Sequence, residues 1–258
     1  MDKYYIRSVN RSFDILFQFT EGSQLSNSDL CKRLNLPQST VFRLLSTMVD
    51  RKFIEEIPET NKYKLGISCL KLGSCFLSGN DLRKCSFPYL EKLRDEIGET
   101  VHLALFNGIE IVYIEKLQSS YPIGMMASRV GSVCQAYCTG VGKSILAFLP
   151  NQEISLYFQH VKLEKRTKNT ITEITELLTE FEEIRKKGYA TDKEENEQNV
   201  SCVAAPIFGV KGILASISIS GPKDRIMSEG LANMSLIQSV LNAASEITKQ
   251  MGGEYPSP

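Results

Sequence analysis

No stretch of the sequence is apolar over the roughly 18 consecutive residues that a membrane-spanning helix needs. The first residues, MDKYYIRSVNRSF, contain no apolar segment of the kind found in secretion signals. Seven cysteines are present without a C-x-x-C pair, and their odd number is typical of free thiols in a reducing compartment. Low-complexity segments and internal repeats are absent as well. We therefore expect a cytoplasmic protein that has no membrane partner.

An excess of either charge is also missing, since lysine plus arginine and aspartate plus glutamate both number 30 in the 258 residues. This balance excludes a uniformly basic coat for polynucleotides, but it leaves room for a local basic patch. Residues 1–66 carry ten basic and eight acidic side chains, an excess of only two. If this segment binds DNA, one copy should bind weakly and two copies side by side should be needed. The chain length itself favours two domains.

Two short helices joined by a tight turn are predicted for residues 26–48, SNSDLCKRLNLPQSTVFRLLSTM. Ser26 and Asp29 match a variant of the capping box at the start of the first helix. The second helix should start at Pro37, because proline is tolerated in a first helical turn. Its apolar face consists of Val41, Leu44, Leu45 and Met48. The hydroxyl, amide and guanidinium groups left on the other face suit a DNA major groove, although an ordinary helix pair in a core has the same pattern.

The segments on either side of this pair extend the pattern to a winged helix. Residues 8–19 have the single apolar stripe of an amphipathic helix. Residues 53–57 and 63–65 can form two strands around the turn cluster Pro-Glu-Thr-Asn. Because an isolated hairpin is barely stable, this ribbon should pack on the three helices. We therefore predict an N-terminal winged helix-turn-helix domain over residues 1–66.

The rest of the chain predicts a linker helix over residues 67–80 and an α+β domain over residues 81–258. The strongest hairpin signal is Asn107-Gly108 between two alternating runs, residues 100–106 and 109–117. A helix from residue 81 to 97 precedes this hairpin. Further short runs are expected at 123–127 and 131–137, helices at 142–148, 170–187 and 229–251, and strands at 189–191, 202–208 and 213–220. Mostly antiparallel strands with helices before, between and after them are typical of the α+β class.

Several segments, in order along nearly the whole chain, resemble the IclR-type transcriptional regulators. In the N-terminal part they are LPQSTVFRLLSTM and FIEEIPETNKYKLG. In the C-terminal part they are FPYLEKLRDEIGETVHLALFNG, ASRVGS, TGVGKSILAFLP, IRKKGYATDKEENEQNVSCVAAPIF and SISISGP. The resemblance implies a GAF-like effector domain with an antiparallel sheet, and dimers or dimers of dimers on palindromic operator DNA. It also implies a regulator, more often a repressor, whose operator affinity responds to a small organic acid or sugar acid.

The resemblance and the helix geometry together indicate the residues that contact DNA. They are Gln38, Ser39, Thr40, Phe42, Arg43 and Thr47 on the second helix, with Lys62 and Lys64 on the ribbon. Arg43 could pair with a guanine or with a phosphate, and the sequence leaves both open. Ser39 and Thr40 are equally typical of helix caps, and the two lysines could simply be solvated.

For the effector, the resemblance implies a pocket of polar groups at the mouth of the sheet. Asp192 and Cys202 have the family spacing of ten residues, and Ser218 and Ser220 alternate on one strand, so their hydroxyls share a face. Ser216 is an alternative to Ser218, because the chain is one residue shorter than the family pattern here. Gly140 and Val141 start a helix, where free N–H groups and the helix dipole favour a carboxylate. The apolar wall is expected from Met125, Met126 and Leu146.

Particular residues indicate other functions that the sequence leaves open. Cys138, Asp192 and Cys202 could meet in space and bind zinc or another soft metal, as in a metal- or redox-responsive regulator, although their spacing is not a zinc signature. His102 is expected to be a buried core residue. The segment GVGKS resembles the end of a phosphate-binding loop, but Tyr137 stands where its first glycine would be. A small-molecule hydrolase built on Cys202 is the enzyme alternative. We expect no catalytic residues and no cofactor, only an effector.

Overall fold

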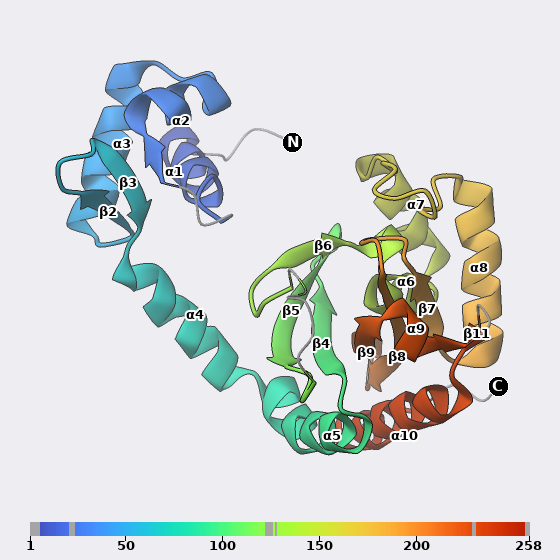
Figure 1. Ribbon diagram of the computed structural model, residues 1–258. Helices are drawn as coiled ribbons and strands as arrows, with labels where there is room; N and C mark the ends of the chain where they lie inside the picture. The colour runs from blue at the N-terminus through green and yellow to red at the C-terminus, as the bar shows by residue number, and fades with distance from the viewer. Residues whose placement is uncertain (1–5, 21–23, 122–125, 127, 229–230, 256–258) are drawn as a thin grey trace. The chain divides into compact units, whose positions relative to one another are not determined.

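The computed structural model describes residues 6–20, 24–121, 126, 128–228 and 231–255 of the chain. The chain divides into two compact units, Met1–Asn80 and Asp81–Pro258, called unit 1 and unit 2 below. Figure 1 shows the elements of both. Within the described ranges, no helix combines the length and the apolar character needed to cross a bilayer.

Unit 1 contains the predicted winged helix. Its elements are α1 (Arg7–Phe17), β1 (Leu25–Ser26), α2 (Asn27–Leu34), α3 (Gln38–Asp50), β2 (Ile54–Ile57), β3 (Lys62–Leu65) and α4 (Ile67–Gly79). The three strands form one antiparallel sheet in the order β1-β3-β2, with the short strand β1 as an addition to the predicted ribbon. Three helices followed by a ribbon therefore confirm the predicted N-terminal fold.

The helix pair α2–α3 forms for the local reasons that the sequence indicated. The Ser26 hydroxyl accepts a hydrogen bond from the Asp29 N–H (3.2 Å), and the Asp29 carboxylate accepts one from the Ser26 N–H (2.9 Å), which completes the capping box. Asn35 adopts the left-handed conformation that ends α2, with φ at 50°. Pro37 is the N-cap of α3 and not its first helical residue, so α3 starts one residue later than predicted.

One apolar core holds the helices and the ribbon of unit 1 together. Its fully buried side chains are Ile15, Phe19, Leu30, Val41, Leu45 and Ile54. Ile54 lies on β2, so the ribbon is attached to the helices by packing, as the marginal stability of a free hairpin required. The expected inner face of α3 is confirmed, although Leu44 is only partly buried.

Helix α4 follows the ribbon directly. The Ser68 hydroxyl donates to the Arg51 carbonyl (2.9 Å), and the Gly66 N–H donates to the Phe53 carbonyl (2.8 Å), so the start of α4 is fixed to the winged helix. Gly66 is required there, because a β-carbon would overlap the Lys52 carbonyl oxygen. None of the 13 residues of α4 is buried, although the helix is largely apolar.

Unit 2 is built on a six-stranded antiparallel sheet with the order β6-β5-β4-β9-β8-β7. The strands are β4 (Thr100–Phe106), β5 (Glu110–Leu117), β6 (Val133–Gln135), β7 (Ala190–Lys193), β8 (Val200–Gly209) and β9 (Gly212–Pro222). The helices are α5 (Asp81–Ile97), α6 (Gly140–Leu146), α7 (Asn151–His160), α8 (Ile174–Lys187), α9 (Lys223–Ile226) and α10 (Met234–Gln250). A small pair, β10 (Met227–Ser228) with β11 (Leu231–Ala232), precedes α10. The predicted α+β class with an antiparallel sheet is confirmed.

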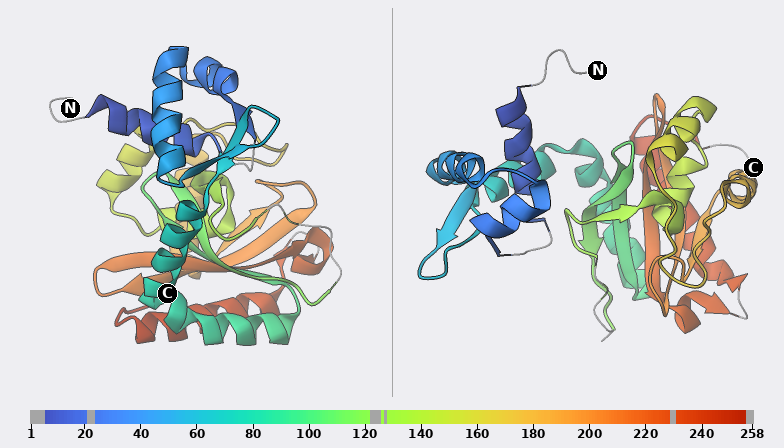
Figure 2. Two further views of the ribbon diagram at one scale, coloured as in Figure 1. Left: turned by 90° about the vertical axis from the view of Figure 1, so that its left-hand side faces the viewer. Right: turned by 90° about the horizontal axis from the view of Figure 1, so that it is seen from above.

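Helices cover both faces of this sheet. The helices α5 and α10 run side by side along one face (Figure 2), and the fully buried Ile217 and Ile219 of β9 point towards them. The intervening serines of β9 point to the other face, where every residue of α6 is buried. Phe181 of α8 and Tyr157 of α7 complete the core on that side. This second face carries the cavity described below.

The structure corrects several predicted boundaries. The helix expected at 170–187 begins at Ile174, because the Thr167 and Thr170 hydroxyls donate to the carbonyls of Glu194 and Glu195 (2.6 and 2.7 Å) and hold the chain in a loop. The closing helix begins at Met234, after an Asn233 cap, and not at residue 229. The helix α7 was not predicted at all. The run expected at 123–127 lies outside the described residues except for position 126.

Candidate functional site

The outer face of α3 carries the polar side chains that the sequence singled out. Gln38, Ser39, Phe42, Arg43 and Thr47 are exposed, and Thr40 is half-buried. This placement follows from the burial of Val41, Leu45 and Met48 on the opposite side of the same helix. Ser39 and Thr40 form no helix cap, since the N-cap is Pro37 and no side chain caps α3.

The two ribbon lysines differ in their surroundings. The Lys64 ammonium lies 3.2 Å from the Glu55 carboxylate across the β2–β3 pair, which offsets its charge. Lys62 is exposed and forms no ion pair with any residue that the structure describes. Of the two, Lys62 is therefore the better placed to meet a phosphate.

A cavity of about 360 Å³ opens in unit 2 where α6 begins above the sheet. Seven of the predicted effector residues line it: Met126, Gly140, Val141, Asp192, Cys202, Ser218 and Ser220. The sheet register explains why residues so far apart in sequence meet, since Asp192 is opposite Cys202 and Cys202 is opposite Ser220. A cavity of this size is at the lower end of those that hold small ligands.

Two predicted wall residues lie elsewhere. Leu146 is fully buried in the core beneath α6 and does not line the cavity, because it belongs to the last turn of that helix. Met125 lies outside the described residues. Ser216, the alternative to Ser218, donates to the Ala205 carbonyl (3.0 Å) and contacts the Ser144 hydroxyl (2.6 Å), so it does not face the cavity.

The floor of the cavity is a small network of hydroxyl and imidazole groups. The Ser218 and Ser220 hydroxyls lie 3.3 Å apart, and the His102 Nδ1 atom lies 3.5 and 3.4 Å from them. On its other side, the His102 Nε2 atom lies 2.9 Å from the Ser128 hydroxyl. Burial, and then the charge of Lys116, lower the pKa of His102 to about 3, so the ring is neutral at physiological pH.

Sequence reasoning missed the part that His102 plays. It is buried, as expected, but it also lines the cavity. The pairing of β4 with β9 sets His102 opposite Ser218, and the sequence carries no signal for this register. Ten further lining residues were also missed, among them Tyr113, Asn196 and Arg166. Asn196 and Arg166 lie in loops, where no periodicity indicates which way a side chain points.

Asp192 and Cys202 form the acidic side of the floor. Burial, and then the charge of Glu195, raise the pKa of Asp192 to about 7. Burial, and then Asp192, raise the pKa of the Cys202 thiol well above its ordinary value, so this sulfur stays protonated. Gly140 lies close to both, since a β-carbon there would lie 2.5 Å from the Cys202 sulfur and 3.5 Å from the Asp192 backbone nitrogen.

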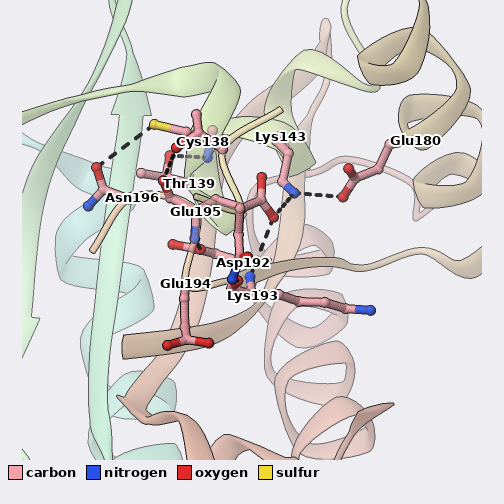
Figure 3. Close-up of polar contacts among 12 residues, drawn as sticks. Cys138, Thr139, Lys143, Glu180, Asp192, Lys193, Glu194, Glu195 and Asn196 are labelled. Carbon is pink, nitrogen blue, oxygen red and sulfur yellow. Dashed lines mark hydrogen bonds and ion pairs between the residues drawn. The ribbon is translucent and has the colours of Figure 1, made fainter. Parts of the chain in front are cut away.

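A buried ion-pair cluster lies directly behind the floor (Figure 3). The fully buried Lys143 ammonium contacts the carboxylates of Glu180 (2.6 Å) and Glu195 (2.5 Å). Burial alone would lower the pKa of Lys143, but the Glu195 and Glu180 charges raise it above its ordinary value. The Glu195 N–H in turn donates to Asp192 (2.6 Å), so α6, α8 and the floor are joined. The Lys143 ammonium is therefore not available to bind a phosphate, so the segment GVGKS does not act as a phosphate-binding loop.

The structure does not form a metal site from the three residues considered above. Cys138 does not line the cavity, and its sulfur lies 3.8 Å from the Asn196 side-chain oxygen. Burial, and then Asp192, raise the pKa of Cys138 to about 12, which disfavours the thiolate that a metal binds. Over the described ranges, no three histidine, cysteine or acidic side chains are grouped to hold a metal ion.

Comparisons with known proteins agree with this arrangement. Two family models match, the IclR helix-turn-helix domain over residues 8–58 and the bacterial transcriptional regulator IclR C-terminal domain over residues 75–249. The HTH-type transcriptional regulator KdgR of Escherichia coli is 32% identical over 253 residues, which cover 97% of this chain and 95% of that protein. The transcriptional repressor AllR of Escherichia coli is 30% identical over 249 residues, which cover 95% and 90%.

The crystal structure of Thermotoga maritima IclR has the same fold, with a TM-score of 0.69 and 33% sequence identity over 96% of this chain and 100% of that one. These relatives are transcriptional regulators and not enzymes, which confirms the prediction of a regulator and argues against the hydrolase alternative. With a DNA-binding fold in unit 1, a lined cavity in unit 2 and family matches over both, the chain belongs to the IclR family of bacterial transcriptional regulators.

Proposed function

We propose that this protein is a repressor whose operator affinity is controlled by a small organic acid or sugar acid bound in the cavity of unit 2. The observation that carries the effector part is the meeting of Asp192, Cys202, Ser218 and Ser220 around one ligand-sized space. Hydroxyl and amide groups there can hydrogen-bond the oxygens of such an acid. The repressor part is supported by AllR, a relative that is itself a repressor.

DNA binding is assigned to the outer face of α3 and to the ribbon. Gln38 and Arg43 are long enough to reach base edges in a major groove, and a good bidentate base contact contributes about 1–3 kcal/mol of discrimination. Ser39, Thr40 and Thr47, with Lys62 and Lys64 on the ribbon, are assigned to the phosphate backbone. Phe42 is assigned to an apolar contact in the groove.

Operator binding by a self-associated form is supported by two observations on unit 1. The excess of two basic residues over residues 1–66 is small for a lone DNA-binding domain. Apolar side chains are exposed on α1 and α4, among them Phe13 (53%), Phe17 (69%), Leu70 (64%) and Phe76 (56%). Several large apolar side chains exposed on one domain are typical of protein interfaces. We assign it to a second copy of the chain, which would bring two α3 helices to one operator.

Control by the effector is then a matter of linkage. A ligand that binds one arrangement of two copies better than another shifts the population towards that arrangement, and the spacing of the two α3 helices changes with it. The coupling free energy cannot exceed the difference in ligand affinity, which is commonly about 1–3 kcal/mol.

A thermal-shift screen of the full-length protein with small organic acids and sugar acids tests this function. A ligand at about 100 times its Kd should stabilise the folded protein by roughly 2.7 kcal/mol. The same ligand should change the gel-shift affinity for an operator selected from random duplexes. Loss of the shift in Ser220→Ala and Asp192→Ala variants is expected. A hit whose shift survives both substitutions would place the effector outside this cavity.

A further inference from the structure

Arg166 lies in the loop between α7 and α8 and lines the exposed rim of the cavity. Its guanidinium forms no hydrogen bond or ion pair with the residues that the structure describes. Its charge nevertheless acts within the cavity. Burial raises the pKa of the Cys134 thiol, another lining residue, and Arg166 is among the groups that oppose this rise. The side chain is thus an unpaired cation directed at the ligand space.

The backbone that carries Arg166 is fixed to the cavity. The Arg166 and Thr167 N–H groups both donate to the Thr170 hydroxyl (3.1 and 2.8 Å). The Thr167 and Thr170 hydroxyls donate in turn to the carbonyls of Glu194 and Glu195 (2.6 and 2.7 Å), just before the lining residue Asn196. Because the loop is already ordered, a ligand that binds Arg166 need not pay for fixing its backbone.

The charges around the cavity are distributed unevenly. Among the described lining residues, Arg166 is the one cation, since His102 is neutral. The lining also holds two carboxyl groups, Asp192 on the floor beside the Cys202 thiol and the half-buried Glu197, whose charge acts on Lys116. The Gly140 N–H, one of the amides expected to hold a carboxylate, already donates to that thiol. An anionic group is therefore better placed at the rim than on the floor.

The floor offers hydrogen-bonding groups without a net positive charge. The hydroxyls of Ser218 and Ser220, the His102 ring and the Asp192 carboxyl can each exchange hydrogen bonds with hydroxyl groups of a ligand. The cavity of about 360 Å³ would hold roughly a dozen waters at about 30 Å³ each, so a two-carbon acid would fill only a small part of it.

Building on the proposed function, we propose that Arg166 is a specificity-determining residue that pairs with the carboxylate of the effector at the rim. The hydroxyl groups of the effector then meet the floor. This orientation identifies the effector class as a hydroxylated carboxylic acid of sugar-acid size, in preference to a short keto acid.

The test compares the full-length wild type with Arg166→Gln and with a matched control, Lys165→Gln. The control removes the same charge from the neighbouring exposed residue, which does not line the cavity. Each protein is titrated with D-galacturonate and D-gluconate, with the uncharged probes D-galactose and D-glucitol, and with lactate as a short hydroxy acid. Thermal shift and calorimetry at low and high salt are the readouts. Equal melting temperatures of the three proteins without ligand verify folding.

The sugar acids should stabilise the wild type and Lys165→Gln alike, whereas the Kd should weaken by about tenfold or more in Arg166→Gln. Binding of the uncharged sugars should be weak and the same in all three proteins. Sugar-acid binding that is unchanged in Arg166→Gln overturns the role of Arg166 while the proposed function stands. Stabilisation by lactate but not by the sugar acids overturns the ligand class. If none of the acids stabilises the wild type, the acid effector of the proposed function fails as well.

Discussion

Asp192 is buried in the cavity floor, and its environment makes stability depend on pH. Burial, and then the Glu195 charge, hold its pKa at about 7, above the ordinary 3.8. Between these values the unfolded chain releases this proton while the folded chain keeps it, so the free energy of unfolding should fall as pH rises from about 4 to 7. Asp192→Asn retains the oxygen that accepts from the Glu195 N–H. The free energy of unfolding of this variant should therefore fall less between about pH 4 and pH 7 than that of the wild type. Urea unfolding at several pH values measures the difference.

The groups that face Asp192 set the controls for this experiment. They include Glu195 in the following turn, Lys143 on α6, the Cys202 thiol on β8, and Cys138 and Tyr113. The pKa of Glu195 is raised as well, chiefly by burial, so part of the pH dependence should remain in Asp192→Asn. Asp224→Asn, the same change at an exposed carboxyl, should leave the profile as it is in the wild type. Identical profiles for Asp192→Asn and the wild type would argue against the raised pKa.

Arg43 is the exposed cation on the outer face of α3. Its replacement by alanine should weaken binding to a selected operator duplex by at least about 1–3 kcal/mol per half-site, because a bidentate contact is lost. Unit 2 should keep its effector response. Gel shifts at a fixed salt concentration measure this, with Arg51→Ala, an exposed arginine at the end of α3, as the matched control. Equal affinities of the wild type and Arg43→Ala would remove Arg43 from the DNA contacts.

At the scale of elements, the Lys143 cluster joins α6 to α8. Lys143→Met would leave the Glu195 carboxylate buried and unpaired, so we expect a loss of about 3–5 kcal/mol of stability. Because Glu180 is partly exposed and can be hydrated without Lys143, we expect the loss of stability to lie near the lower end of this range. Lys187→Met on the exposed side of α8 breaks the solvent-screened ion pair with Glu183 and should leave the stability nearly unchanged. Chemical unfolding followed by circular dichroism separates the two variants, and similar midpoints would contradict this role of the cluster.

Some elements and site residues could be predicted from the sequence, and others could not. The Asn107-Gly108 hairpin was predictable, because its turn depends on local interactions alone. The Asn107 side chain accepts hydrogen bonds from two N–H groups just after it, and Gly108 has φ at 101°. The Ser218 and Ser220 pair was predictable from alternation on one strand. His102 and Arg166 were not, because their places depend on the β4–β9 register and on hydrogen bonds from the α7–α8 loop to Glu194 and Glu195. Such long-range contacts leave no periodic signal in the sequence.

At the scale of the whole molecule, the unburied helix α4 predicts self-association. Phe76→Glu or Leu70→Glu would place a charge in the proposed interface, so each should shift the chain towards monomer and weaken operator binding. Leu156→Glu, on an exposed face of α7, is the matched control and should behave as the wild type. Analytical ultracentrifugation gives the mass in solution. A wild type that sediments as a monomer at working concentrations would refute this use of the apolar surface.

The exposed phenyl ring of Phe42 has a consequence for the bases themselves. An apolar side chain on a groove-facing helix can contact the C5 methyl group of thymine, which protrudes into the major groove. In the proposed docking, a thymine opposite Phe42 would be recognised by this methyl and not by a hydrogen bond. An operator synthesised with uracil at that one position keeps every base pair and every charge. The wild type should nevertheless bind this uracil duplex more weakly than the thymine duplex. Phe42→Ala should bind both duplexes equally well.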